Sequence, residues 1–225
     1  MIRSTAVALL AAALAAPAFA QSPWYAGISA GQSLTDDELV RNRESTITLG
    51  TDFATDFDDK DGAWKATLGW RLGPMLSVEV NYADLGGHGT VTTFLGGDPL
   101  LPAAIAIRRE ITAYGADVVL RAPIGDRFAI FGRAGAARAR LAASAVLFGN
   151  VEFTGGAGER ERSTRVEETV GRFGVGVQWD FAPNLGLRAE WERYADVGKA
   201  FRVGGTGTTG EADTDMVCAG LILRF

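Results

Sequence analysis

The chain contains one cysteine and one histidine among its 225 residues. A single cysteine excludes an intramolecular disulfide, and Cys218 with His88 cannot supply the ligands of a conventional zinc site. No uninterrupted apolar run reaches the roughly 20 residues that a membrane-spanning helix requires. The formal net charge of −5 argues against nucleic acid as a partner. We therefore expect no metal and no cofactor, and a fold held together by packing and strand pairing alone.

The first 20 residues are typical of a secretory signal peptide. Arg3 supplies the positive start, an apolar stretch runs from Ala6 to Ala16, and Ala18-Phe19-Ala20 is a small-x-small cleavage site. Pro17 interrupts the apolar stretch, which is also too short to span a bilayer. The sequence predicts export and cleavage, with residues 21–225 forming one domain of net charge −6.

The rest of the chain shows the two-residue periodicity of β-strands. Eight segments have it, near residues 23–31, 63–72, 75–83, 111–122, 127–138, 169–181, 184–194 and 215–225. Three connections are short and carry Pro or Gly, at 73–74, 123–126 and 183–184, and the other four are long and rich in Gly. Short and long connections alternate, as they do in an up-and-down barrel with both termini at the short-turn end. The expected fold is all-β, an eight-stranded antiparallel up-and-down transmembrane β-barrel.

Charge separates the two faces of these strands. One face is free of ionisable groups and includes Leu68, Val78, Val118, Val175 and Leu187. The opposite face holds Lys65, Thr67, Arg71, Glu79, Asn81, Asp117, Arg121, Arg133, Arg172, Gln178, Arg188, Glu190 and Glu192. A soluble lipocalin-type barrel would turn the charges outward to water, whereas a membrane barrel must turn them inward, because Arg or Lys facing lipid costs about 2–4 kcal/mol at the midplane.

The signal peptide, the aromatic positions and the terminal Phe225 favour the membrane barrel. The last nine residues alternate strictly, with Arg224 on the face opposite to Phe225. With charges inward, the sequence predicts a lumen ion-pair network of Arg71, Glu79, Asp117, Arg121, Arg133, Arg172, Arg188, Glu190 and Glu192. It leaves the partners within that network open.

The aromatic residues are predicted to form two girdles at the membrane interfaces. If strand directions alternate, Trp24, Trp70, Phe128, Trp179 and Phe225 fall at the periplasmic ends, and Trp64, Tyr82, Tyr114, Phe173 and Trp191 fall at the outer ends. All five tryptophans of the chain belong to these two sets.

Three stretches resemble the OmpA-type transmembrane barrel family: 58–71, 78–86 and 188–194, with Phe131-Gly132-Arg133-Ala134-Gly135 similar to its fifth strand. The resemblance implies an outer-membrane barrel, with a lumen salt bridge between Arg133 or Arg188 and Glu79 or Glu190. Members of that family commonly carry a periplasmic peptidoglycan-binding domain after the barrel. This sequence ends at Phe225, so the resemblance supports the barrel and its loops only.

Other local patterns carry little chemistry. His88 lies among glycines at the start of a predicted long loop, and no serine motif is near it in sequence, so we predict no catalytic role and no enzyme. Gly205-Thr206-Gly207-Thr208-Thr209-Gly210 matches the dinucleotide fingerprint by letter, but it lacks the strand and helix that the motif needs. The first long loop, near 32–61, is acidic and lacks EF-hand spacing; it is either solvated or a weak divalent-cation binder.

The leading functional hypothesis is an integral outer-membrane protein of a Gram-negative bacterium. It would have a structural role in envelope integrity, with surface loops available for recognition or adhesion. One alternative is a narrow gated pore for ions or small solutes, and a third is a surface enzyme acting on lipid or protein. Expected partners are outer-membrane lipid and lipopolysaccharide, the barrel-assembly machinery through Phe225, and an unidentified surface ligand.

Overall fold

The computed structural model describes residues 22–37, 53–58, 60–94, 103–149, 160–197 and 212–225. The predicted signal peptide, the acidic stretch 38–52 and the glycine-rich hexapeptide 205–210 lie outside these ranges. The described residues form nine strands: β1 (Trp24–Asp37), β2 (Phe53–Asp58), β3 (Lys60–Arg71), β4 (Leu76–Phe94), β5 (Ala103–Ile124), β6 (Phe128–Phe148), β7 (Glu161–Asp180), β8 (Leu185–Val197) and β9 (Ala212–Arg224). Within those ranges there is no helix long and apolar enough to cross a membrane.

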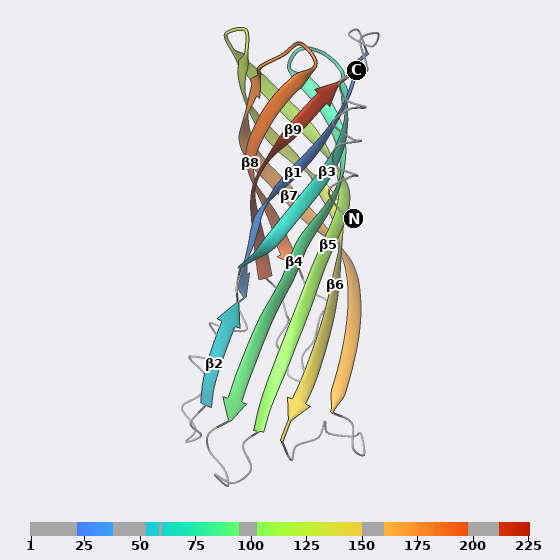
Figure 1. Cartoon of the computed structure of the whole chain (residues 1–225). Coiled ribbons are helices and arrows are strands. Elements are labelled where there is room, and N and C mark those ends of the chain that lie inside the picture. Colours follow the sequence, from blue (N-terminus) through green and yellow to red (C-terminus); the bar gives the residue numbers. More distant parts are fainter. Residues whose placement is uncertain (1–21, 38–52, 59, 95–102, 150–159, 198–211) are drawn as a thin grey trace, which may run out of the picture.

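Eight of the strands close into an antiparallel barrel, which confirms the predicted fold (Figure 1). The order around the barrel is β4-β3-β1-β9-β8-β7-β6-β5, and β4 also pairs with β5. The first and last strands meet, with Tyr25 opposite Arg224 and Asp37 opposite Ala212. Closure gives every membrane-level strand two hydrogen-bonded neighbours, as a lipid environment requires. The short turns and the C-terminus lie together at one end, drawn at the top of Figure 1.

The strands are longer than the periodicity predicted, and the predicted loops are correspondingly shorter. β4 runs to Phe94 where the sequence suggested an end near 83, and β6 runs to Phe148 where it suggested 138. Beyond the membrane level the barrel divides, and β4, β5, β6 and β7 continue as a projecting sheet edged by β2 (Figure 1). Paired strand therefore replaces much of what was predicted to be loop.

Two irregularities mark the point where the barrel divides. The β4–β5 register shifts between Asp84 and Gly87, where Gly86 has a φ of 78° and a Cβ would strike the side chain of Asp61. The β8–β9 register shifts between Tyr194 and Val197, where Asp196 has a φ of 57°. Bulges of this kind bend a strand and increase its twist. They allow β4 to follow the projecting sheet while β8 turns away from β7.

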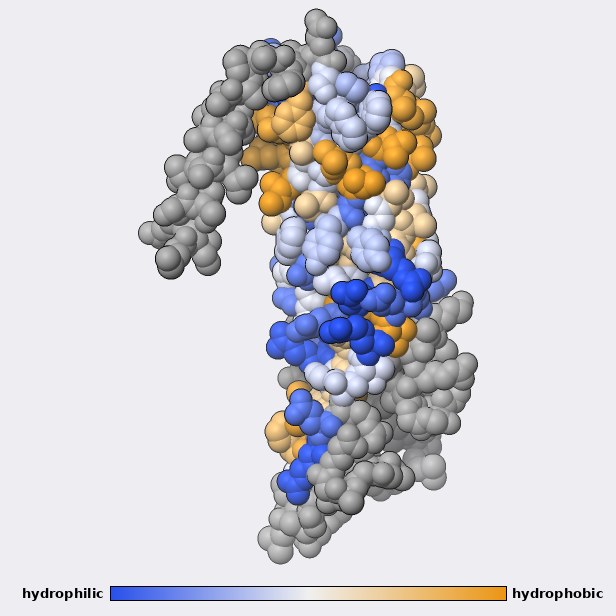
Figure 2. Space-filling view, turned by 90° about the vertical axis from the view of Figure 1, so that its right-hand side faces the viewer, coloured by the Kyte–Doolittle hydropathy of each residue, from blue (hydrophilic) through white to orange (hydrophobic). Residues whose placement is uncertain are grey.

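The outward face of the barrel is an apolar belt bounded by aromatic side chains. On β5 it extends from Ile124 to Tyr114, and on β6 from Phe128 to Ala136, with side chains such as Leu120 and Val118 at least half exposed. At about 3.4 Å per residue and a strand tilt near 40°, these spans match the roughly 25 Å apolar band of outer-membrane barrels. Figure 2 shows the belt giving way to a dense hydrophilic patch towards the projecting sheet.

Candidate functional site: the filled lumen

The centre of the lumen is an ion-pair network organised around Arg133. Inward positions of β3, β4, β5, β6, β7 and β8 contribute Lys65, Glu79, Asp117, Arg133, Arg172, Arg188, Glu190 and Glu192, all buried. Four are cationic and four are anionic, so the layer is neutral. A buried charge is tolerable only with such compensation, because an uncompensated one costs several kcal/mol.

Arg133 contacts all four carboxylates of the network. Its Nη2 lies 2.8 Å from Glu79 Oε2 and 2.5 Å from Asp117 Oδ2. Its Nη1 lies 2.7 Å from Glu190 Oε2 and 2.5 Å from Glu192 Oε1. The planar guanidinium fork suits this arrangement, since its donors point in fixed directions in one plane. One side chain from β6 thus joins strands β4, β5 and β8 across the lumen.

The other three cations complete the pairing from different strands. Lys65 contacts Glu190 at 2.5 Å and also Glu192. Arg172 pairs with Asp117, and Arg188 Nη1 lies 2.7 Å from Glu79 Oε1. Each carboxylate therefore has at least two cationic partners, which fixes the positions of the side chains.

Two tyrosines and two amides extend the network. Tyr25 donates to Glu79 Oε1 at 2.6 Å, and Tyr194 donates to Glu192 Oε2 at 3.1 Å. Asn81 donates to Asp117 at 2.8 Å, and Gln178 accepts from Arg188 at 3.1 Å. The guanidinium of Arg188 also stacks 4.7 Å above the Phe131 ring. These contacts satisfy the lone pairs and donors that the ion pairs leave over.

An apolar layer fills the lumen on the side of the projecting sheet. Its buried residues are Ala63, Ala83, Leu85, Ile111, Ala113, Ala137, Ala139, Leu141, Val170, Tyr194, Val197, Met216 and Cys218. Leu85, Ala83, Ala113 and Met216 have no measurable solvent exposure. Cys218 lies in this layer, with its Sγ 3.8 Å from Glu190 Oε1. A layer so closely packed leaves no room for water in this part of the lumen.

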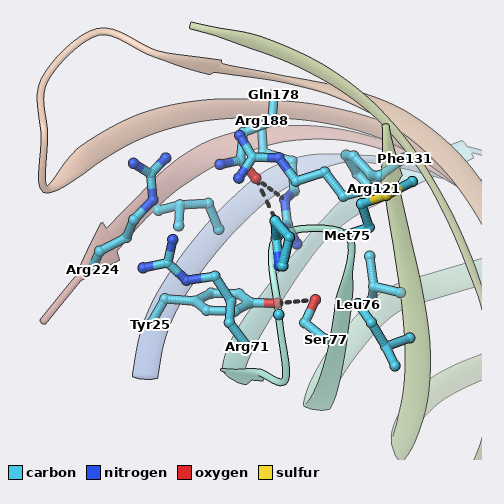
Figure 3. Close-up of a pocket in the computed structure, with 14 residues that line it drawn as sticks. Tyr25, Arg71, Met75, Leu76, Ser77, Arg121, Phe131, Gln178, Arg188 and Arg224 are labelled. Atoms are coloured by element: carbon cyan, nitrogen blue, oxygen red, sulfur yellow. Dashed lines mark hydrogen bonds between the residues drawn. The ribbon is translucent and has the colours of Figure 1, made fainter. Parts of the chain in front are cut away.

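The opposite mouth of the lumen contains a small arginine-lined cavity (Figure 3). Its volume is about 20 Å³, room for about one water molecule, and Arg71, Arg121, Arg188 and Arg224 are among its lining residues. Arg121 Nη2 lies 2.6 Å from Asp180 Oδ2, and Arg224 pairs with the same carboxylate. Tyr25 closes the cavity from the network side and hydrogen-bonds Ser77 at 3.1 Å.

The structure thus divides the nine residues predicted for the lumen network into two groups. Glu79, Asp117, Arg133, Arg172, Arg188, Glu190 and Glu192 meet in the central network, whereas Arg71 and Arg121 lie at the mouth. Lys65, Tyr25 and Tyr194 also belong to the network but were not predicted for it, although Lys65 was placed on the inward face. The alternation of side chains along each strand could have identified them, because each lies an even number of residues from other inward-facing positions of its strand.

The predicted girdle residues contact one another within each set and not between sets. At the short-turn end, the ring centroids are 4.9 Å apart for Trp24 and Trp70 and 6.0 Å apart for Phe128 and Trp179. At the other end they are 5.5 Å apart for Trp64 and Tyr82 and 5.8 Å apart for Phe173 and Trp191. Tyr114 is exposed on the outward face of β5, and the Phe225 amide donates to the Trp24 carbonyl at 3.2 Å.

His88 lies in a strand and not in a loop, contrary to the prediction. It faces inward from β4, is buried, and its Nε2 lies 3.4 Å from Ser33 Oγ and 3.3 Å from Thr35 Oγ1. Ser33, which is fully buried, donates its hydroxyl proton to the Leu85 carbonyl. A serine whose proton is bound to a carbonyl is not set up for transfer to a histidine base. Among the described residues, no group of three or more His, Cys, Asp or Glu could hold a metal ion.

Comparisons with known structures place this geometry among small barrels. The crystal structure of Neisserial surface protein A aligns over 91% of this chain and 98% of that protein, with 15% identity and a TM-score of 0.53. The structure of the attachment invasion locus protein Ail of Yersinia pestis aligns over 88% of this chain and 98% of that protein, with 16% identity and a TM-score of 0.42. The structure of the outer membrane protease OmpT of Escherichia coli aligns over 94% of this chain and 99% of that protein, with 12% identity and a TM-score of 0.45. At these identities the likeness to the Neisserial protein shows the fold alone.

Comparison with curated protein sequences gives no match. The sequence profile of a protein family, described as the outer membrane protein beta-barrel domain, matches residues 6–225. That range includes every strand described above and nearly the whole chain. The chain belongs to the outer membrane protein β-barrel domain family, and so to the proteins of the bacterial outer membrane.

Proposed function

We propose that this protein is a closed, non-conducting barrel that contributes to envelope integrity and holds a projecting sheet above the outer leaflet for recognition or adhesion. The observation that carries the proposal is the stacking of two unlike layers in the lumen. A neutral ion-pair network lies at membrane depth, and a closely packed apolar layer covers it. An eight-stranded interior is only wide enough to be filled by side chains, and here both layers are filled.

A gated pore is the second candidate, and the ion-pair network is the observation that favours it. Arg133 has four carboxylates within 2.8 Å and could exchange partners without losing all of its contacts. Exchange within the network leaves the apolar layer in place, however. A conducting path would also require Leu85, Ile111 and Leu141 to move apart, with exposure of apolar surface to water. The closed barrel is therefore the function that the geometry supports better.

Conductance of residues 21–225 in a planar bilayer tests this proposal. Insertion is first established by the faster gel mobility of the unboiled barrel. We expect inserted wild-type protein to remain electrically silent, because no open path crosses the apolar layer. Reproducible discrete current steps from the folded protein would contradict the proposal and establish the pore. Arg133→Lys serves as a matched variant, since any current gated by the network should change its open probability.

The envelope role is tested in cells by deletion and complementation. We expect a strain without the gene to become more sensitive to detergents and large antibiotics, and the wild-type gene to restore resistance. A deletion strain with unchanged sensitivity would count against the envelope role and leave recognition by the projecting sheet. We also propose that the barrel-assembly machinery recognises Phe225. Phe225→Ala should then lower the amount of folded barrel in the membrane.

A further inference from the structure

The mouth of the lumen at the short-turn end carries positive charge that its own residues do not balance. Arg71 from β3, Arg121 from β5 and Arg224 from β9 approach the cavity there from three different strands (Figure 3). Among the described residues, Asp180 of β7 is the only side-chain carboxylate in ion-pair range of these arginines. The mouth therefore carries two more positive than negative charges, whereas the central network behind it is neutral.

Asp180 has no capacity left for a third arginine. Arg121 Nη2 lies 2.6 Å from its Oδ2, and Arg224 contacts its Oδ1. Gln178 donates to the same Oδ1 at 2.7 Å. Both oxygens of the carboxylate are thus occupied by donors from three side chains. Arg188, which also lines the cavity, has its own carboxylate partner in the central network and does not compete for Asp180.

Two groups in the mouth remain available to a ligand. Arg71 makes neither an ion pair nor a side-chain hydrogen bond with the part of the chain that the structure describes. Arg121 Nε is buried and has no hydrogen-bond partner there. The side chains of Arg121 and Arg224 are only 22% and 12% exposed, and like charges withdrawn from water repel one another more strongly. An anion bound between the arginines would offset this repulsion and accept the unused hydrogen bonds.

Charge and size together favour a phosphate group as this anion. At pH 7 a phosphate monoester carries a charge of about −1.5 to −2, which matches the excess of two positive charges, whereas a carboxylate or a chloride ion would cancel half of it. The planar forks of arginine also suit the oxygens of phosphate. The cavity of about 20 Å³ has room for one oxygen atom. Exposed Pro74 and Met75 form part of its lining, so the other oxygens would face water at this rim.

The position of the mouth indicates the side from which phosphate would arrive. Tyr25 closes the cavity towards the network through hydrogen bonds to Ser77 and Glu79. The neighbouring outward side chains Trp70 and Leu120 belong to the apolar belt, so the strands separate the arginines from lipid. The short turns of bacterial outer-membrane barrels face the periplasm. A soluble phosphate group therefore has direct access, whereas a phospholipid headgroup would have to pass around the ends of the strands.

We propose that the short-turn mouth binds a phosphate group of a soluble periplasmic molecule between Arg71, Arg121 and Arg224. Bound phosphate would connect β3, β5 and β9 at the end of the barrel where their charges are not balanced. The proposal goes beyond the closed-barrel function and does not rest on it. A barrel that conducts ions could bind the same phosphate, so the two proposals fail independently.

Equilibrium dialysis of radiolabelled inorganic phosphate tests the site, with the folded barrel of residues 21–225 in a non-ionic detergent that carries no phosphate. We expect saturable binding of one phosphate per barrel. Arg71→Gln should weaken it about ten-fold through loss of a charge-assisted hydrogen bond, and should leave the fold intact because Arg71 has no partner in the described structure.

The matched control is Arg127→Gln, which removes one positive charge from an exposed turn at the same end of the barrel but outside the cavity. It should change the affinity for phosphate less than two-fold. Heat-dependent gel mobility establishes folding of each variant. Absence of saturable binding to the wild type, or an equal loss in the two variants, would overturn the proposal.

Competition on the wild-type protein provides a second arm that does not depend on the folding of any variant. At constant ionic strength, displacement of bound phosphate by acetate or chloride should require a concentration at least about ten-fold higher than displacement by unlabelled phosphate. Displacement at equal concentrations would show an unselective site and overturn the assignment to phosphate. A short-chain phosphatidylethanolamine should leave the phosphate bound. Displacement by this lipid would assign the mouth to a headgroup and overturn the soluble source.

Discussion

β5 and β6 each have a membrane half and a projecting half. The face that is apolar in one half is charged or polar in the other. Within the belt, Val118 faces outward and Asp117 faces inward, whereas beyond Tyr114 the outward side chain is Glu110 and the inward one is Ile111. The strand alternates without interruption through both halves. What changes is the medium outside, from lipid to water. In one continuous strand the apolar side chains therefore face outward where lipid surrounds the barrel and inward where water does.

The two halves also close the barrel in different ways. In the membrane half the inward charges satisfy one another, so closure depends on the pairing of particular side chains. Towards the projecting half the inward residues form an apolar cluster beside the buried Ser33, His88 and Thr214. We infer that the charged layer fixes the arrangement of the strands, while the apolar layer keeps water and solutes out. The two layers should therefore respond differently to substitution.

The largest effect is expected from Arg133→Met in the charged layer. Four carboxylates would then share only Lys65, Arg172 and Arg188, and a net negative charge would be buried. Breaking a buried charge network in this way costs about 3–5 kcal/mol of unfolding free energy. Urea unfolding of the barrel in lipid vesicles, followed by gel mobility, measures the loss. Arg133→Lys keeps the charge and should lose less. A loss below about 1 kcal/mol in Arg133→Met would show that the network does not stabilise the barrel.

A pair of substitutions on one face of β5 tests where lipid gives way to water. Val118→Arg places a charge in the apolar belt and should cost about 2–4 kcal/mol. Glu110→Arg, four outward positions further along the strand, should stay within about 0.5 kcal/mol because the site faces water. The same urea titration measures both. Similar costs at the two positions would mean that the exchange of faces does not mark the membrane boundary.

The eight strands could be predicted because inward and outward residues differ so sharply in charge. Arg133, Glu79 and Glu190 were placed inward from sequence for that reason. Their pairing could not be predicted, since it depends on how the closed barrel brings β6 opposite β4 and β8. Arg133 is 54 positions from Glu79 and 57 positions from Glu190. Pairs so far apart leave no local pattern in the sequence.

The predicted strands were too short for a physical reason that β5 illustrates, since it was predicted over 111–122 and spans Ala103–Ile124. The apolar residues at outward positions of β5 stop at Tyr114. Ile111 and Ala113 continue the alternation, but on the inward face. The apolar residues therefore move from the outward to the inward face, and in the sequence this exchange resembles the end of a strand. The contact between His88 and Ser33 was missed for a related reason, because both were assigned to loops and they meet only when their strands extend.

The smallest expected effect concerns Asp61, near the start of β3 and beyond the aromatic ring. Its Oδ2 accepts the Gly87 amide at 2.6 Å, and this bond, with a second from Gly62, lowers the pKa of the carboxyl group below its ordinary value of 3.8. A lowered pKa in the folded state means that the carboxylate stabilises the local fold above about pH 4 and that this contribution is lost as the pH falls below that value. The bulge at Gly86 should therefore loosen in acid.

Hydrogen exchange measures this loosening at a single amide. In the wild type, we expect the protection factor of the Gly87 amide to be constant from pH 7 to pH 5 and to decrease below pH 4. In Asp61→Asn the neutral amide accepts more weakly than a carboxylate, so protection should be lower at pH 7 and nearly independent of pH. The Val80 amide, in the paired part of β4, is the internal control and should not change. Identical profiles for Gly87 in the two proteins would show that strand pairing alone, and not the Asp61 carboxylate, holds the exit of β4 from the membrane.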